Sequence, residues 1–214
     1  MVRKQKINPM NRNITRLLSA FFVLIVFGST WEACKQPFGK PHLGCGGPMV
    51  GNEPTSVMLI FSNVNNTTDV DTAMWTNERG NIVSSKAHLT LSANSSYRVR
   101  VMFLNINALP ASSGYDVTPS VQKEGSSYLV CFVDSLNLYG NLAANLNWAR
   151  QDMDNSPSPM PVGLIDSFWT GADSVCAVMA TKLHHQYKVK NGDCAPGYID
   201  IQALDTIYIS PTKG

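Results

Sequence analysis

The sequence predicts an all-β fold, an antiparallel β-sandwich of about eight or nine strands with an immunoglobulin-like or jelly-roll layout and one short helix. Three observations predict it. Apolar and polar residues alternate along 97–103 and 142–148, which is the period of a half-buried strand. Clusters of turn-forming residues separate the strand segments, and no segment has a helical period long enough to connect parallel strands.

The individual elements follow from local patterns. Residues 57–61, Val-Met-Leu-Ile-Phe, form a continuous apolar run typical of a strand covered on both faces. Residues 93–96, Ala-Asn-Ser-Ser, indicate a hairpin turn. The single helix is expected from Thr118 as N-cap through Pro119 to Gly125. The remaining strands are predicted at 71–77, 86–92, 126–134, 163–170, 173–185 and 198–209.

The first 33 residues have the pattern of a bacterial signal peptide. Five basic residues and no acid lie within 1–16, and an apolar run follows from 17 to 28. A helix of that run would measure only ~18 Å, which is shorter than the ~30 Å hydrocarbon core of a membrane. A cleaved signal therefore explains the segment better than a spanning helix does.

Cys34, which follows the small residue Ala33, is the expected site of lipid attachment in the mature protein. Ordinary cleavage after Gly28 or Thr30 is the alternative, and it would leave Cys34 as a plain thiol. The segment 34–54 is rich in glycine and proline and is expected to be a flexible tether. One β-sandwich domain is then expected over 55–214.

The charge balance changes when the signal is removed. The whole chain has 17 basic and 15 acidic residues, but residues 1–33 hold five of the basic ones and one acid, which leaves a net charge of −2. The basic character of the precursor thus belongs to its targeting segment, and the domain offers no electrostatic footprint for nucleic acid.

Three short segments resemble a family of small uncharacterised lipoproteins of Bacteroidota, loosely labelled "type 1 periplasmic binding fold" lipoproteins. They are 116–132 with its Asp116-Val-Thr start, 169–186 with Trp169-Thr-Gly-Ala, and 197–201. The resemblance implies an outer-membrane lipoprotein, periplasmic or surface-facing, that serves a TonB-dependent transporter and has no known activity. Two departures stand out: residues 125–127 are Gly-Ser-Ser where the family often has acid-His-Gln, and His184 stands where it often has Arg.

The four further cysteines are expected to lie in an oxidising compartment, where disulfides form readily. Cys45 lies in the tether and Cys194 in the loop 191–197, so a Cys45–Cys194 disulfide is the favoured pairing. Cys131 and Cys176 lie within strand segments, where they are either paired with each other or buried as small apolar residues.

Histidine offers the best candidates for a metal site. His184 and His185 are adjacent, and neighbouring side chains of a strand point to opposite faces, so one of them would have to join His88 from another strand. The competing interpretation is that these histidines are exposed to solvent at a strand end.

Four tripeptides match an Asp-Ser/Thr-aliphatic pattern that resembles the O-glycosylation motif of exported Bacteroidota proteins. Their hydroxyl residues are Thr72, Ser135, Ser174 and Thr206.

Catalytic chemistry has little support in the sequence. There is no Gly-x-Ser-x-Gly elbow, and no histidine or acid lies close in sequence to a serine in a pattern typical of a nucleophile. We therefore expect a non-enzymatic binding or accessory component of the cell envelope, without a cofactor and with the membrane and an envelope protein as partners. A periplasmic carrier of a metal or small ligand is the alternative.

Overall fold

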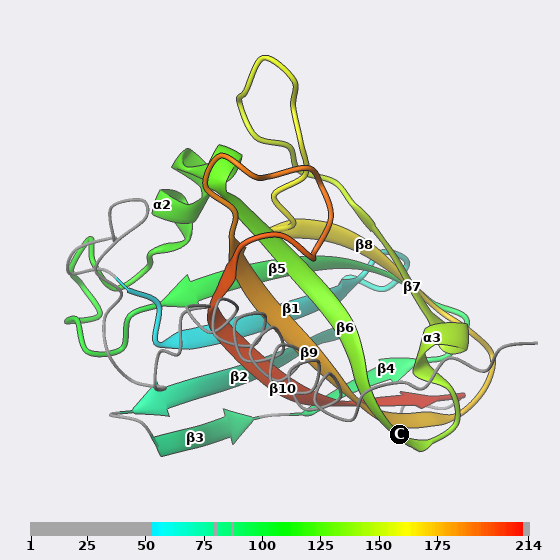
Figure 1. Ribbon diagram of the computed structural model, residues 1–214. Helices are drawn as coiled ribbons and strands as arrows, with labels where there is room; N and C mark the ends of the chain where they lie inside the picture. The colour runs from blue at the N-terminus through cyan, green and yellow to red at the C-terminus, as the bar shows by residue number, and fades with distance from the viewer. Residues whose placement is uncertain (1–52, 79–80, 87, 212–214) are drawn as a thin grey trace, which may run out of the picture. The chain divides into compact units, whose positions relative to one another are not determined.

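The computed structural model describes residues 53–78, 81–86 and 88–211, which belong to one compact unit, Leu43–Gly214 (Figure 1). Ten strands lie in this part of the chain. They are β1 Ser56–Asn63, β2 Val70–Glu78, β3 Asn81–Lys86, β4 His88–Ser92, β5 Ser96–Leu104, β6 Tyr128–Tyr139, β7 Leu146–Arg150, β8 Ile165–Thr170, β9 Val175–His185 and β10 Tyr198–Ser210. The short helices are α2 Thr118–Lys123, η1 Gly125–Ser127 and α3 Leu142–Asn145.

The strands form two sheets that face each other, so the predicted all-β sandwich is confirmed. One sheet has the order β3-β2-β1-β5-β8-β7, and the other has the order β4-β10-β9-β6. Figure 1 shows β6, β9 and β10 lying across the strands of the six-stranded sheet. All described strand pairs are antiparallel except β4 with β10, which are parallel.

Two segments differ from the prediction. The expected strand 86–92 belongs to two strands, because β3 ends at Lys86 and pairs with β2, whereas β4 pairs with β10. The expected strand 142–148 begins as helix α3. Asn141 caps this helix by accepting a hydrogen bond from the Ala144 amide at 3.3 Å, and such a cap favours a helical turn over the alternating pattern.

Helix α2 starts one residue earlier than expected, with Val117 rather than Thr118 as its N-cap. The Thr118 hydroxyl is used differently, since it accepts a hydrogen bond from the Phe103 amide at 2.9 Å. Thr118 therefore attaches the helix to β5 instead of capping it.

The core between the sheets is built around aromatic residues. Phe168 on β8 contacts Phe61 of its own sheet and Phe132 of the opposite sheet, with ring centroids 5.2 and 5.0 Å apart. Trp148 stacks on Phe168 at 5.8 Å. Because Phe168 is completely buried, it contributes on the order of 2–3 kcal/mol by burial alone.

Side chains from β2 and β5 accept hydrogen bonds from backbone amides of the edge strand β4. Asp71 Oδ2 accepts a hydrogen bond from the Thr90 amide at 2.6 Å, and the Tyr97 hydroxyl accepts one from the Ser92 amide at 2.8 Å. These bonds satisfy backbone donors that would otherwise be open to another strand. Within the described residues, no helix has the length and hydropathy needed to cross a membrane.

Candidate functional site

A seam runs along one side of the sandwich, where the edge strands β6 and β7 face each other. At one end of the seam, Val130 on β6 bonds to the loop after β7, with its amide 2.7 Å from the Val162 carbonyl. Further along, the pairing of β6 with β9 shifts register between Asp134 and Leu136 and again between Asn137 and Tyr139. Such irregularities bend a strand away from its neighbours, and the seam opens beside α3.

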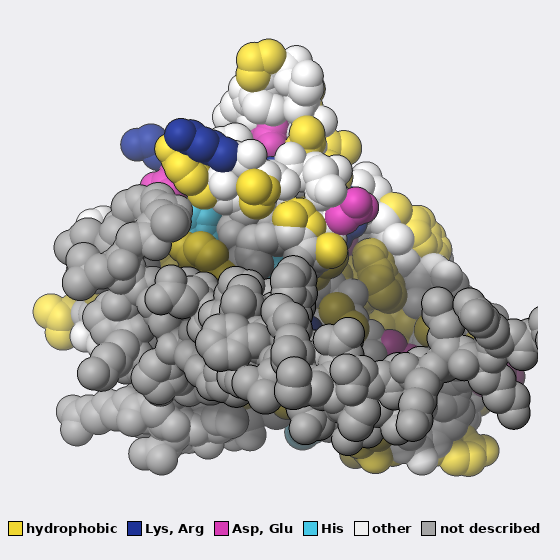
Figure 2. All heavy atoms as spheres, in the orientation of Figure 1, with side chains coloured by type: hydrophobic (Ala, Val, Ile, Leu, Met, Phe, Trp, Pro, Cys, Tyr) yellow, Lys and Arg dark blue, Asp and Glu magenta, His cyan; other side chains and the backbone are white. Residues whose placement is uncertain are grey.

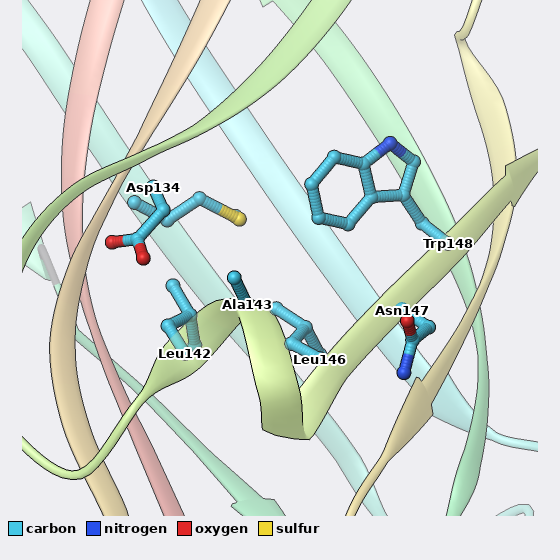
Figure 3. A pocket seen from close by; sticks show the side chains of 7 residues that line it. Asp134, Leu142, Ala143, Leu146, Asn147 and Trp148 are labelled. Atoms are coloured by element: carbon cyan, nitrogen blue, oxygen red, sulfur yellow. The ribbon is translucent and has the colours of Figure 1, made fainter.

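A pocket of about 250 Å³ lies in this opening (Figure 3). We call it the seam pocket. Its lining combines an apolar floor and walls with two polar side chains, and it consists of Asp134, Leu142, Ala143, Leu146, Asn147, Trp148 and Met179. Sites for small molecules usually measure roughly 300–1,000 Å³, so this pocket fits a small ligand or one group of a larger ligand.

Asp134 is the titratable residue of this lining. Its Oδ2 accepts a hydrogen bond from the Asn137 amide group at 3.0 Å. Its Oδ1 is buried and has no hydrogen-bond donor among the described residues. A buried acceptor without a donor is costly, so a ligand that brings an N–H or O–H group to Oδ1 would gain affinity.

Trp148 forms the wall opposite Asp134, as Figure 3 shows. Its ring is held from behind by Phe168 and at its edge by Phe132, whose centroid lies 6.1 Å away. A ring fixed in this way offers a rigid apolar surface, and a cationic group over its face would be attracted as well. The pocket is therefore suited to a ligand with an apolar body and a hydrogen-bond donor.

The histidine candidates do not form one site. His88 pairs with Thr206, which pairs with Val178, and Val178 lies six residues from His184 along β9. Six strand residues span ~20 Å, so a shared metal site of His88 with His184 or His185 is wrong. Among the described residues, no three His, Cys, Asp or Glu side chains are grouped to hold a metal ion.

The competing interpretation, that His184 and His185 are exposed to solvent at a strand end, is also wrong. His184 and His185 are only 8% and 6% exposed. Figure 2 shows a small area of histidine surface bordered by hydrophobic side chains. Burial and the charge of Lys182 lower the pKa of His184, while a hydrogen bond with the Pro196 backbone opposes them.

His185 instead lies in the middle of a row of side chains across three strands. Tyr128 on β6 and Tyr198 on β10 are both paired with it in the sheet. The Tyr128 ring stacks on the His185 ring at 4.7 Å, and the Tyr198 hydroxyl lies 2.5 Å from His185 Nδ1. A register shift between Ile199 and Ile201 then brings Asp200 to the same place, with its Oδ2 3.9 Å from Nδ1.

The ionisation of this row reflects burial and nearby acids. Burial raises the pKa of Asp200 to about 7, and the charge of Glu53 adds to the effect, while a hydrogen bond with Tyr128 opposes it. Burial, followed by the charges of Asp200 and Glu124, raises the pKa of Tyr128 above its ordinary value. Burial lowers the pKa of His185, and the charge of Glu124 opposes it.

The cysteine pairing differs from the prediction. Cys194 forms a disulfide with Cys131, with Cα atoms 6.0 Å apart, so the favoured Cys45–Cys194 pairing and the Cys131–Cys176 alternative are both wrong. Cys176 is a free, half-buried thiol. The bond joins the loop after β9 to the outward face of β6, a proximity that only the fold creates. Cys34, Cys45 and the segment 1–33 lie outside the described residues.

The four hydroxyl candidates for glycosylation differ in accessibility. Ser135 and Ser174 are exposed. Thr72 and Thr206 are half-buried within strands, and the preceding Asp71 and Asp205 are buried. A glycosylating enzyme that recognises the acid together with the hydroxyl residue would therefore bind Asp134-Ser135 and Asp173-Ser174 more readily than the other two pairs.

No protein-family model, no curated protein and no solved structure matches the chain. The sequence patterns did not indicate five residues of these two sites, namely Asp134, Trp148, Tyr128, Tyr198 and Asp200. Their roles depend on strand register and on β-bulges, and a single sequence carries no clear signal for either.

Proposed function

We propose that this chain is an exported, lipid-anchored cell-envelope protein that binds a small ligand in the seam pocket without changing it chemically. The observation that carries the proposal is the pocket lining, with apolar walls, a fixed indole ring and one carboxylate oxygen that lacks a donor. A single acid beside apolar walls favours binding over catalysis, which generally needs a nucleophile or a second acid–base group nearby.

Export is supported by two independent features. The N-terminal segment has the charge and hydropathy pattern of a secretion signal, and Cys34 follows it directly. The Cys131–Cys194 disulfide is the kind of bond that persists outside the reducing cytosol. The resemblance to Bacteroidota lipoproteins adds an outer-membrane location and a transporter of the TonB-dependent class as partner.

Ligand binding is tested by native mass spectrometry of the protein released from its own membranes. We expect a small-molecule adduct on the wild type and its loss in Ala143→Trp, because Ala143 lines the pocket and a tryptophan there would fill it. Ala144→Trp is the matched control, since Ala144 is exposed on the same short helix and does not line the pocket. An adduct that survives in Ala143→Trp would reject the seam pocket as the site.

The anchor is tested by the mass of the mature N-terminus. We expect a lipid-modified chain that begins at Cys34, and release from the membrane in Cys34→Ala. An unmodified chain that begins at Ser29 or Trp31 would reject the anchor. Cross-linking in native membranes then tests the partner, and we expect an outer-membrane transporter among the captured proteins.

The second candidate function is a periplasmic carrier of a metal ion or small ligand. The specific observation in its favour is the row of Tyr128, His185 and Tyr198 with Asp200, which contains side chains able to bind a cation. The two functions use different residues, so variants of one site are expected to leave the other intact.

A further inference from the structure

The row around His185 places four potential metal-binding atoms close together. The Tyr198 hydroxyl lies 2.5 Å from His185 Nδ1, and Asp200 Oδ2 lies 3.9 Å from the same nitrogen. The Tyr128 ring stacks on the His185 ring at 4.7 Å, and its side chain interacts with the Asp200 carboxyl group. The set thus contains three oxygen donors and one nitrogen donor, contributed by β6, β9 and β10.

The two distances measured from His185 Nδ1 are compatible with ligands around one ion. Donor atoms bound at about 2.1 Å in an octahedral site lie about 3 Å apart when adjacent and about 4 Å apart when opposite. The observed distances of 2.5 and 3.9 Å need changes of about half an ångström or less to match.

The framework of the site is rigid, whereas one side is accessible. His185 and Tyr128 are 6% and 2% exposed, and stacking of their rings fixes them against the core. Tyr198 is 39% exposed, and the side chain of Asp200 is 22% exposed. An ion could therefore reach the cluster from solvent while two of its ligands stay in place.

The electrostatic surroundings favour a cation of high charge. Glu53 lies close enough to act on Asp200, and Glu124 acts on both Tyr128 and His185. Glu53 and Glu124 are exposed to solvent, and together with Asp200 they place three acids around the cluster, whose mutual repulsion a positive ion would reduce.

The donor types select the kind of metal. A tyrosine binds metals strongly as phenolate, and since its ordinary pKa is about 10, only a strong Lewis acid displaces the proton near neutral pH. Phenolate and carboxylate are hard oxygen donors, which match a hard trivalent ion better than the soft ions bound by thiolates. Calcium and magnesium prefer sets made of carboxylate, carbonyl and water oxygens.

From this arrangement we propose that Tyr128, His185, Tyr198 and Asp200 form a binding site for ferric iron. On binding, the two phenol groups release their protons to solvent and the iron keeps its oxidation state. The proposal is independent of the seam pocket, which lies beside α3 and shares none of these residues.

The test is titration of the full chain with ferric nitrilotriacetate, which keeps the ion in solution. We expect one iron per chain and a visible phenolate-to-iron charge-transfer band, a signal that carboxylate or imidazole ligands alone do not produce. Tyr198→Phe removes only the hydroxyl oxygen and should weaken binding at least tenfold and shift or abolish the band. His185→Gln and Asp200→Asn should weaken binding without abolishing the band.

Tyr208→Phe is the matched control, because Tyr208 lies on the same strand and is 42% exposed. It should bind iron as the wild type does. Thermal melting of each variant without metal separates lost binding from lost folding. Absence of saturable binding, a band that is unchanged in Tyr198→Phe, or equal effects of Tyr198→Phe and Tyr208→Phe would overturn the proposal. None of these outcomes bears on ligand binding in the seam pocket, which Ala143→Trp tests separately.

Discussion

The ammonium group of Lys190 donates a hydrogen bond of 3.0 Å to Asp154 Oδ2, and both side chains are almost completely buried, at 4% and 2% exposure. Lys190 also donates to the Gly125 carbonyl at 2.6 Å. The ion pair therefore ties together the loop after β7, the loop after β9 and the turn η1, which Figure 1 shows at the same end of the sandwich.

We expect Lys190→Met to destabilise the fold by about 3–5 kcal/mol, because it leaves the Asp154 carboxylate buried without its partner. The measurement is urea unfolding at neutral pH. Lys188→Met is the control, since Lys188 is exposed and lies over the Tyr187 ring at 5.0 Å. Equal losses in the two variants would contradict a structural role for the pair.

The same ion pair should make the stability of the fold depend on pH in the acid range. Burial alone would raise the pKa of Asp154, but hydrogen bonds from Ser156, Lys190 and Met160 outweigh it and lower the pKa from 3.8 to about 2. A lowered pKa contributes stability above pH 4 that is lost as the pH falls toward 2. In Asp154→Asn this loss should be absent, and unfolding measured from about pH 5 to 2 checks it. A parallel decline in both proteins would count against this assignment.

Asp205 should have the opposite effect on the pH dependence of stability. It is 1% exposed, neither of its oxygens has a hydrogen-bond partner among the described residues, and burial raises its pKa from 3.8 to about 7. Its folded form therefore holds a proton more tightly than its unfolded form, so stability declines as the pH rises from about 4 to 7. The full penalty above pH 7 is about 4 kcal/mol at most.

Asp205→Asn removes that penalty. Relative to the wild type it should gain about 2–3 kcal/mol between pH 5 and pH 8, as measured by urea unfolding at the two pH values. The exposed Asp173→Asn serves as the control and should track the wild type. If the difference between wild type and Asp205→Asn does not change with pH, the carboxyl group is not protonated in the folded protein.

The disulfide is expected to stabilise the domain by about 4 kcal/mol, because its cysteines are separated by 63 residues and the bond restricts a long loop of the unfolded chain. Reduction, or the pair Cys131→Ala and Cys194→Ala, should lower the melting temperature accordingly. Cys176→Ala should have a smaller effect, since this thiol is free. A domain whose melting temperature is unchanged by reductant would contradict this assignment.

Gly197 is expected to tolerate no side chain. Its φ is +87°, and a Cβ atom there would clash with the His185 carbonyl oxygen. Gly192 has the same φ but open space around it. Gly197→Ala should therefore cost clearly more stability than Gly192→Ala, which should lose about 1 kcal/mol from the backbone conformation alone. Comparable losses would show that the backbone angle, rather than the clash, decides the cost.

Local patterns in the sequence were sufficient for the fold class and most element positions. The alternation along 97–103 predicted β5, and the turn at 93–96 has Asn94 at a φ of +50°, as turn residues allow. These predictions succeeded because side-chain periodicity is a local property. The export signal and the anchor at Cys34 likewise depend on local patterns, and they remain predictions.

Only the tertiary structure decided which distant residues meet. It paired Cys194 with Cys131, separated His88 from His185, and placed His185 between Tyr128 and Tyr198. The physical reason is register: shifting a strand by one residue sends every side chain to the other face, and β-bulges such as those near Asp134 and Asp200 make such shifts locally. Register is set by the packing of the whole sandwich, which no single segment of the sequence specifies.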